Sequence, residues 1–256
     1  QVFESMNLPI VKYTWFYDTD YAETPDDIKA RIEELGYPVI VKPAKLGSSV
    51  GITYVKEPVN IGKAIDEAIQ YDNKIIVEKA VENLLEVNCS VLGNYAYQQT
   101  SVIEEVKSKS DFLTYQDKYL GNGKGSKGSK GGIKSQGMVS ASRIIPARIE
   151  TTTEEEVKRI AKEAFKALNL SGVCRIDFLI NKETKEVFIN EPNTIPGSLS
   201  FYLWEPAGKP YNELLDEVIN MAIKDYKARH KKIYTFDTNI LAGYSGGVKG
   251  SKGKLG

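Results

Sequence analysis

Four polar residues in the last third of the chain have the types and spacing that a metal and anion site needs. Arg175 and Asp177 lie in one apolar segment, and Glu191 and Asn193 close the next one. The two segments read as strands joined by a polar turn, and side chains alternate between the faces of a strand. If the register holds, all four side chains share a face. Carboxylate and amide oxygens suit Mg²⁺, and the arginine suits an anionic substrate.

The same alternation predicts what lies on the other face of this hairpin. Cys174, Ile176, Phe178 and Phe188 would point away from the polar face and into a core. A plainer interpretation of the polar face also stands, in which an arginine pairs with a carboxylate across a hairpin and binds no metal.

A glycine-rich segment upstream predicts a phosphate site. The segment Lys42-Pro43-Ala44-Lys45-Leu46-Gly47-Ser48-Ser49-Val50-Gly51 follows a strand-like run. Backbone N–H groups in such a loop can surround phosphate oxygens, and a lysine supplies charge. The lysine precedes the glycines, so this is not a Walker A loop, nor is it a dinucleotide fingerprint. Alone it could be a hairpin turn, but with the predicted Mg²⁺ face it favours an ATP site.

A third segment predicts contacts to the rest of a nucleotide. The apolar run 75–77 ends in Glu78-Lys79, an acceptor and a donor for an adenine edge, and the following backbone can add a hydrogen bond. Glu86 lies close enough downstream to reach ribose hydroxyls. By itself a Glu-Lys pair at a strand end is usually only solvated.

Composition excludes several classes of protein. The 256 residues hold 34 Lys+Arg and 34 Asp+Glu, so no net charge favours nucleic acid or an anionic membrane. The longest apolar runs have the length of strands, and the N-terminus shows no signal peptide. Cys89 and Cys174 lie in apolar runs typical of reduced core residues in a cytoplasmic protein. His230 is the only histidine, which argues against a histidine base or a His-ligated metal.

The order of predicted elements indicates an α+β fold. Helices are expected at 25–35, 61–69, 152–168 and 211–228, the third opened by a capping box of Thr152 and Glu155. Strands are expected at 37–41, 51–55, 74–77, 86–92, 95–103, 138–145, 173–180 and 185–190, with a hairpin turn at Gly93-Asn94. This mixture suggests two small lobes, residues 1–82 and 83–256.

Two segments are rich in glycine and lysine. Residues 121–137 contain the sequence Gly-Ser-Lys-Gly twice in succession, and the tail 245–256 repeats the theme. For the tail we expect a solvated linker. For residues 121–137 two hypotheses remain open, a linker or a lid whose lysines (Lys124, Lys127, Lys130 or Lys134) reach phosphates.

In this order, these motifs resemble the ATP-grasp ligases, and more narrowly the D-alanine–D-alanine ligase family. The stretches Lys42-Pro43…Gly47-Ser48-Ser49-Val50-Gly51 and Asn190-Glu191-Pro192-Asn193-Thr194-Ile195-Pro196-Gly197 are specific, and Lys118 fits the lysine before a mobile loop of that family. The resemblance spans about residues 6–215. It implies the ATP-grasp fold, in which two α+β subdomains clasp a nucleotide between their sheets.

The resemblance also implies roles for individual residues. It assigns ATP to Lys42, Ser49, Glu78, Lys79, Val81, Glu86 and Lys118. It assigns two Mg²⁺ ions, or Mn²⁺, to Asp177, Glu191 and Asn193. Catalysis and substrate positioning would fall to Ser48, Lys118, Arg175 and Gly197, with Arg175 and the Gly197 amide facing the oxyanion. The second amino acid would lie at Ser198, Leu199 or Ser200.

The implied reaction makes an amide bond in the bacterial cell-wall pathway. ATP phosphorylates a carboxylate, an amine attacks the acyl phosphate, and ADP and phosphate leave, so no protein nucleophile is needed. Small molecules would be the partners, with a homodimer left open. The family's N-terminal lobe and an upstream ATP-contacting lysine have no counterpart here, and Phe201, Tyr202 and Trp204 add bulk beside the acceptor site. A ligase for another amino acid pair, or a nucleotide-binding module without ligase activity, are therefore the alternatives.

Overall fold

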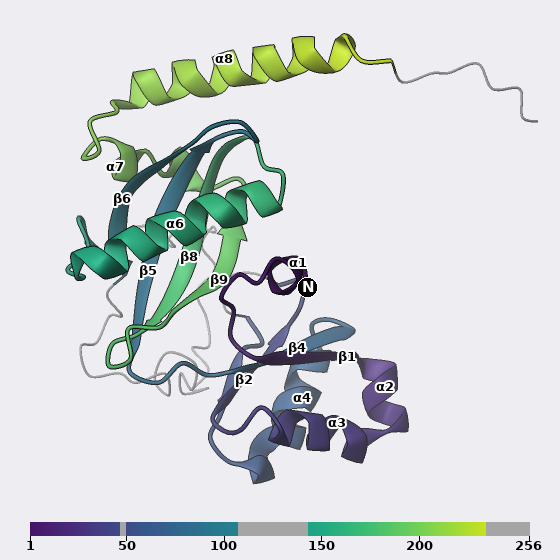
Figure 1. The fold of residues 1–256 in the computed structure, drawn as a ribbon. Coiled ribbons are helices and arrows are strands. Elements are labelled where there is room, and N and C mark those ends of the chain that lie inside the picture. Colours follow the sequence, from purple (N-terminus) through teal and green to yellow (C-terminus); the bar gives the residue numbers. More distant parts are fainter. Residues whose placement is uncertain (47–49, 107–142, 234–256) are drawn as a thin grey trace, which may run out of the picture.

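The computed structural model describes residues 1–46, 50–106 and 143–233 (Figure 1). Its helices are α1 (Val2–Ser5), α2 (Asp18–Glu23), α3 (Pro25–Glu33), α4 (Ile61–Ile69), α6 (Thr151–Ala167), α7 (Phe201–Trp204) and α8 (Tyr211–His230). Its strands are β1 (Tyr13–Tyr17), β2 (Val39–Pro43), β3 (Thr53–Val55), β4 (Lys74–Lys79), β5 (Leu84–Gly93), β6 (Gln98–Val106), β7 (Arg143–Ile144), β8 (Gly172–Asn181) and β9 (Val187–Asn193). Short 3₁₀ turns cover Pro58–Asn60 and Gly197–Ser200.

Strands β1 to β4 form the sheet of a small lobe, in the order β1-β4-β2-β3 with antiparallel pairs. Val39 and Val41 of β2 point into a core with the helices, so Lys42, one residue on, points to the other face. The helices α2, α3 and α4 cover the side of the sheet that lies away from the second lobe (Figure 1). The uncovered face, with Lys42, is therefore turned toward the second lobe.

The helices of the small lobe form where local signals and burial agree. Pro25 opens α3 with its fixed φ, and Asp26 and Asp27 lie in the first turn, where the helix dipole favours negative charge. In α4 the buried residues follow the helical period, at Ile61, Ala64, Ile65 and Ala68. This apolar stripe holds α4 against the sheet.

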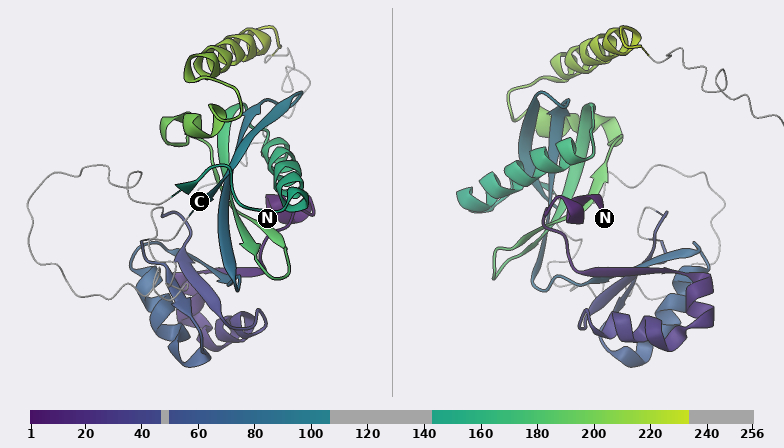
Figure 2. Two further views of the ribbon diagram at one scale, coloured as in Figure 1. Left: turned by 90° about the vertical axis from the view of Figure 1, so that its left-hand side faces the viewer. Right: turned by 45° about the vertical axis from the view of Figure 1, so that its right-hand side comes forward.

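Strands β5 to β9 form the sheet of a large lobe, in the order β7-β6-β5-β8-β9, again antiparallel. Helix α6 covers one face and α7 lies on the other, as the turned views show (Figure 2). Cys89 and Cys174 are both buried in the core under α6 and form no disulfide, as predicted. Ile176 and Phe178 share that core, also as predicted.

The predicted orientation of Phe188 is wrong, because the β8–β9 pairing contains a bulge. Asp177 pairs with Glu191, but the next residue, Phe178, pairs with Ile189, so Asn190 has no partner on β8. One extra residue reverses the alternation of side chains on one side of the bulge. Phe188 consequently packs beside Leu179 on the polar face, while Ile189 enters the core.

The predicted capping box at the start of α6 does not form. The helix begins at Thr151, one residue before the predicted cap, and Glu150 is its N-cap with extended backbone and no side-chain hydrogen bond to the helix. Thr152 is therefore already helical, and its hydroxyl cannot act as the cap.

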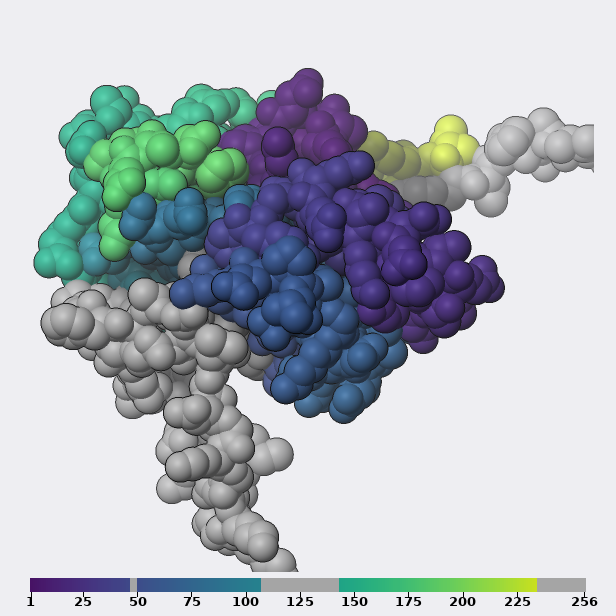
Figure 3. Space-filling model, turned by 90° about the horizontal axis from the view of Figure 1, so that it is seen from below, coloured from purple at the N-terminus to yellow at the C-terminus, as the bar shows by residue number. Residues whose placement is uncertain are grey.

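A small apolar cluster joins the two lobes. Val11, Val81 and Leu179 are buried there, with Leu84 and Phe188 against them. A main-chain hydrogen bond from Ile189 N of β9 to Pro9 O (2.9 Å) also ties the segment before β1 to the large lobe. Seen from below, the β8–β9 turn lies beside the chain that passes between the lobes (Figure 3).

The division predicted at residues 82 and 83 stays a prediction, and the structure adds one fact about the first residues. Leu8 is buried in the core of the large lobe, with Phe3 and Ile10 packed against it, although the small lobe follows in sequence. Within the described residues, no helix is both long and apolar enough to cross a membrane.

Candidate active site

Arg175, Asp177 and Asn193 meet on the face of the large sheet that α6 leaves open. Arg175 donates from Nε and Nη2 to the two oxygens of Asp177, at 2.7 and 2.8 Å. Asn193 Nδ2 donates to Asp177 Oδ2 at 3.0 Å. Glu191 lies directly opposite Asp177 in the ladder, and Asn193 lies opposite Arg175. The shared face predicted for these four residues is therefore formed.

The surroundings of Asp177 raise its pKa. Burial is the main cause, and the nearby Glu86 adds to it, whereas the hydrogen bonds from Arg175 and Asn193 act in the opposite direction. Burial penalises a negative charge, so the carboxylate would gain from a cation beside it. Arg175 provides one such cation.

Strand β5 brings further polar side chains to the same face. Asn88 lies opposite Asp177 in the ladder, and Ser90 lies opposite Arg175. The Asn88 amide lies between two carboxylates: Nδ2 is 3.4 Å from Glu104 Oε2, and a half-turn of the amide places it 3.1 Å from Asp177 Oδ1. The sequence carried a signal for these residues, because Glu86, Asn88 and Ser90 alternate with Val87, Cys89 and Val91.

Glu104 and Arg143, which the sequence reasoning missed, complete this face together with Tyr202, which it noted only for its bulk. Glu104 accepts a hydrogen bond from the Tyr202 hydroxyl at 3.1 Å and forms an ion pair with Arg143, whose Nε lies 3.1 Å from Glu104 Oε1. Glu104 is only 1% exposed, so its charge is balanced inside the protein. Arg143 gave no signal, since it follows a glycine-rich segment and lies in a strand of only two residues.

On the small lobe, Lys42 and Glu78 form an ion pair, with Nζ 2.8 Å from Oε2. Both lie on the uncovered face of the small sheet, which is where the nucleotide was predicted. Lys79 donates instead to the main-chain oxygens of Gly36 and Tyr37, at 3.1 and 2.8 Å. Val81 is buried in the cluster between the lobes, so the polar groups it could offer a ligand are those of its backbone.

The two ends of the glycine-rich segment are held in place. Lys45 N donates to Asp72 Oδ2 at 2.8 Å. Gly51 has φ +71°, and a Cβ there would lie 2.7 Å from Tyr71 Cδ2, so only glycine fits. Ser48 and Ser49 lie outside the described residues, as do Lys118, the segment 121–137 and the tail 245–256.

The segment that begins at Gly197 is strained. Ser198, Leu199 and Ser200 have φ of 52°, 53° and 52°, a left-handed run that is costly for residues with a side chain. Ser198 is exposed, Leu199 packs partly against Trp204, and Ser200 is fully buried. Within the described residues the Ser200 hydroxyl has no hydrogen-bond partner. Backbone strain of this kind is typical of functional sites.

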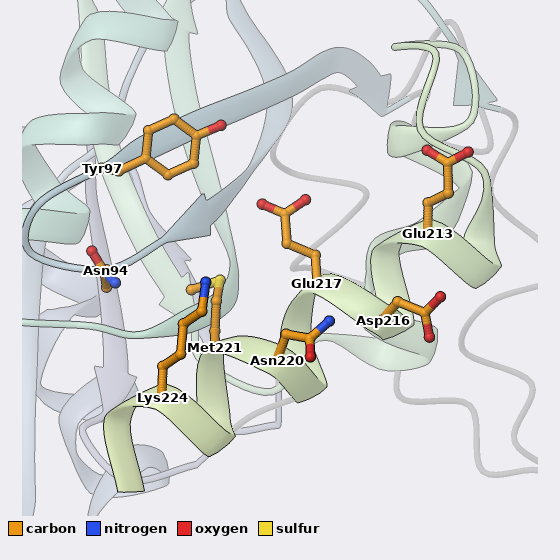
Figure 4. A pocket seen from close by; sticks show the side chains of 8 residues that line it. All are labelled: Asn94, Tyr97, Glu213, Asp216, Glu217, Asn220, Met221 and Lys224. Carbon is orange, nitrogen blue, oxygen red and sulfur yellow. The ribbon is translucent and has the colours of Figure 1, made fainter. Parts of the chain in front are cut away.

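A separate hollow lies far from these residues. Glu213, Asp216 and Glu217 of α8 face Asn94 and Tyr97 of the β5–β6 turn there (Figure 4). Glu217 pairs with Lys209, and the acidic side chains come from one exposed helix face. In the part of the chain that the structure describes, no group of three or more His, Cys, Asp or Glu could hold a metal ion, so this hollow is not a metal centre.

Comparison with known proteins agrees with this geometry. A family model described as D-ala D-ala ligase C-terminus matches residues 2–220. The D-alanine–D-alanine ligase of Thermosipho melanesiensis is 41% identical over 226 residues, covering 88% of this chain and 57% of that protein. That of Thermosipho africanus is 37% identical over 240 residues, covering 94% of this chain and 60% of that protein. The chain thus spans about three fifths of the length of these curated relatives.

Solved structures give the same result. The D-alanine–D-alanine ligase of Coxiella burnetii superposes with a TM-score of 0.70 at 25% identity, covering 90% of this chain and 56% of that one. The VanG D-Ala:D-Ser ligase of Enterococcus faecalis superposes with a TM-score of 0.68 at 28% identity, covering 86% and 59%.

Two antiparallel sheets with charged faces turned toward a common space define an ATP-grasp protein, and the predicted α+β fold is confirmed. Within that class the family model covers most of the chain, and the chain belongs to the D-alanine–D-alanine ligase family. Use of ATP and dependence on a metal ion are general to that family.

Proposed function

We propose that the protein of which this chain is part is an ATP-dependent ligase that joins two D-alanine molecules for peptidoglycan precursors. The observation that carries the proposal is the face on which Arg175, Asp177 and Asn193 are hydrogen-bonded, with Glu191 in register. The Lys42–Glu78 pair on the small lobe supports it, since it supplies charge and polar groups for the other end of a nucleotide.

The residues present fit a magnesium–nucleotide. Asp177, Glu191 and Asn193 offer two carboxylates and an amide, which are oxygen ligands of the kind that Mg²⁺ takes, and they would hold two ions; Mn²⁺ is an alternative metal. When bound, the ions would supply positive charge against the phosphates of ATP. Lys42, Glu78, Lys79, Val81 and Glu86 would bind the nucleotide from the small lobe and the connecting strand.

The remaining residues would serve the acyl group. A carboxylate oxygen of the first D-alanine attacks the γ-phosphorus of ATP, which gives an acyl phosphate and ADP. The neutral amine of the second D-alanine attacks the acyl carbon and loses a proton, and phosphate leaves with the electrons of the C–O bond. Arg175 and the Gly197 amide would stabilise the oxyanion of the tetrahedral intermediate. The work of the protein is positioning and charge stabilisation.

Two other readings have specific support. The likeness to a D-Ala:D-Ser ligase favours a different acceptor amino acid. The length of the chain relative to its relatives keeps open a nucleotide-binding module without ligase activity. For all of these we propose small-molecule partners, a cytoplasmic location where ATP is supplied, and no role in binding nucleic acid.

Phosphate release from ATP separates the three readings. The full-length protein is supplied with ATP, Mg²⁺ and D-alanine, and the product is identified by mass. D-alanyl-D-alanine supports the proposal, and a product only with other amino acids supports the second reading. ATP binding without any product supports the third. Asp177→Asn serves as the matched control, because it keeps the side-chain volume and removes the charge that a metal needs.

A further inference from the structure

Beside Arg175 lies a second arginine for which the proposed reaction has so far no use. Arg143 and Tyr202 are both held by the buried carboxylate of Glu104, one through each oxygen. The side chain of Arg143 is 25% exposed, while that of Glu104 is 2% exposed. The Glu104 carboxylate is therefore buried in the protein, and the Arg143 guanidinium lies above it at the surface of the site.

The orientation of the Arg143 guanidinium is fixed on two sides. Its Cζ lies 4.4 Å from the centroid of the Tyr202 ring, a cation–π contact. Its Nε lies 3.1 Å from Glu104 Oε1, and within the described residues this ion pair is the only polar contact of the guanidinium. The two terminal nitrogens therefore remain as donors for an anion. A guanidinium held in this way is prepared for a carboxylate, which it binds through two parallel hydrogen bonds.

Tyr202 links this guanidinium to the reacting centre. Burial, first, and Glu104 raise the pKa of the Tyr202 hydroxyl, whereas the charges of Arg143 and Arg175 both lower it, so both guanidinium groups lie near this hydroxyl. Arg175 uses its Nε and Nη2 for Asp177, and the proposed reaction assigns its remaining donors to the oxyanion. The terminal nitrogens of Arg143 have no such assignment.

The acceptor of the proposed reaction needs such a group. The amine of the acceptor must reach the acyl carbon beside Arg175. The carboxylate carbon of the acceptor is only two bonds from that amine nitrogen. A negative group so close to the acyl phosphate requires a cation. We propose that Arg143, oriented by Glu104 and Tyr202, binds the carboxylate of the acceptor amino acid. This inference rests on the proposed function.

A competition between two acceptors tests the proposal. D-alanine and D-alaninamide are supplied together to the full-length protein with ATP and Mg²⁺. The amide has no carboxylate to be phosphorylated, so it can react only as the acceptor. The ratio of the dipeptide acid to the dipeptide amide, measured by mass, reports how strongly the site selects the carboxylate. Steps before the acceptor binds are common to both products and cancel.

Arg143→Gln should lower this ratio by about tenfold or more, which is the range expected when a hydrogen bond to a charged group is lost. This variant leaves the buried carboxylate of Glu104 without its cationic partner, which lowers the stability of the fold. The double variant Arg143→Gln/Glu104→Gln removes both charges at nearly constant volume and should lower the ratio to a similar degree. Arg148→Gln is the matched control, because it likewise removes an arginine from a largely buried carboxylate, Glu105, and the ratio should stay at the parent value.

The outcomes are distinguishable from a failure of the proposed function. If the parent protein forms neither product, the ligase proposal itself is wrong. If the parent forms both products and the double variant keeps the parent ratio, Arg143 only balances the charge of Glu104, and the inference is overturned.

Discussion

At the scale of single residues, the site depends on hydrogen bonds that hold charged groups in fixed directions. Asp177 accepts from Arg175 and Asn193, and Glu104 accepts from Tyr202 and forms an ion pair with Arg143. Both carboxylates, one partly and one fully buried, thus have partners, as the low local dielectric demands. Groups oriented before the substrate arrives need no reorganisation when charge develops, which makes them effective in catalysis.

The first prediction concerns Arg175. Arg175→Ala should lower turnover of the full-length ligase by about 10²–10³-fold, the usual loss for one oxyanion donor. The affinity for ATP should change little, because the nucleotide is predicted to bind chiefly through other residues. Stopped assays of phosphate release and equilibrium ATP binding measure the two effects. Arg159→Ala is the control, since Arg159 pairs with Glu156 and Glu163 on the exposed side of α6. Equal turnover in Arg175→Ala and the parent would refute the role.

The second prediction concerns Cys89. Burial raises the pKa of its thiol to about 12, and the thiolate is the species that alkylating reagents attack. Because the raised pKa leaves almost no thiolate, iodoacetamide should not label Cys89 in the folded protein at pH 8, and the rate should stay near zero up to pH 9. Peptide mass mapping before and after addition of urea checks this. Rapid labelling of the native protein would show that the core under α6 opens readily.

At the scale of elements, tight turns and bulges decide which side chains reach the site. The bulge at Asn190 changes the face on which Phe188 lies and keeps Glu191 opposite Asp177. The hairpin turn after β5 sets the pairing of β5 with β6, and hence the position of Glu104 next to Asn88. A single substitution in such a turn should therefore change the strand register, and with it the positions of side chains across the sheet.

The third prediction tests that hairpin turn. A Cβ at Gly93 would lie 2.0 Å from the main-chain oxygen of Tyr97, so Gly93→Ala should lower the free energy of unfolding by more than about 2 kcal/mol. At Gly62, inside α4, the nearest atom to an added Cβ is the Tyr21 hydroxyl at 3.5 Å. Gly62→Ala should raise the free energy of unfolding by about 0.5–1 kcal/mol, as alanine favours a helix. Urea denaturation compares the two, and equal effects would contradict the turn geometry.

At the scale of the whole molecule, the proposed ligand would join the two lobes. Lys42 and Glu78 lie on the small sheet, and Asp177 with its partners lies on the large one. The chain passes from one lobe to the other at the apolar cluster that contains Val81 and Leu179. A ligand that binds only the folded state raises the free energy of unfolding. A nucleotide that contacts both sheets would therefore raise the free energy of unfolding of both lobes.

The fourth prediction uses the two tryptophans of the chain, one in each lobe. Trp15 lies on β1 beside Lys74, and Trp204 is buried in the large lobe with its Nε1 donating to Ser90 Oγ at 3.0 Å. Single-tryptophan variants, Trp204→Phe and Trp15→Phe, report the unfolding of each lobe by fluorescence. ATP with Mg²⁺ at 100 times the dissociation constant should stabilise both transitions by about 2.7 kcal/mol. ATP without Mg²⁺ is the control, and a shift in one lobe alone would show that the nucleotide does not bridge them.

Local patterns in the sequence were enough to predict most elements and the shared face of Arg175, Asp177, Glu191 and Asn193. The reason is that strand alternation and helix period are short-range properties, which neighbouring residues determine together. The helix at 61–69 follows from the same short-range rules. A hairpin after β5 was also predicted, but the expected two-residue turn Gly93-Asn94 is wrong: Gly93 pairs with Gln98, and residues 94–97 form the turn.

Only the tertiary structure decided the rest of the site. No pattern could show that Glu104, Arg143 and Tyr202 meet, because they come from three elements separated by up to 98 positions along the chain. The bulge that turned Phe188 is likewise a property of two paired strands and not of either strand alone. Side chains distant in sequence are brought together by the packing of the sheet and α7. The free energy of that packing depends on contacts between segments, so no single segment determines it.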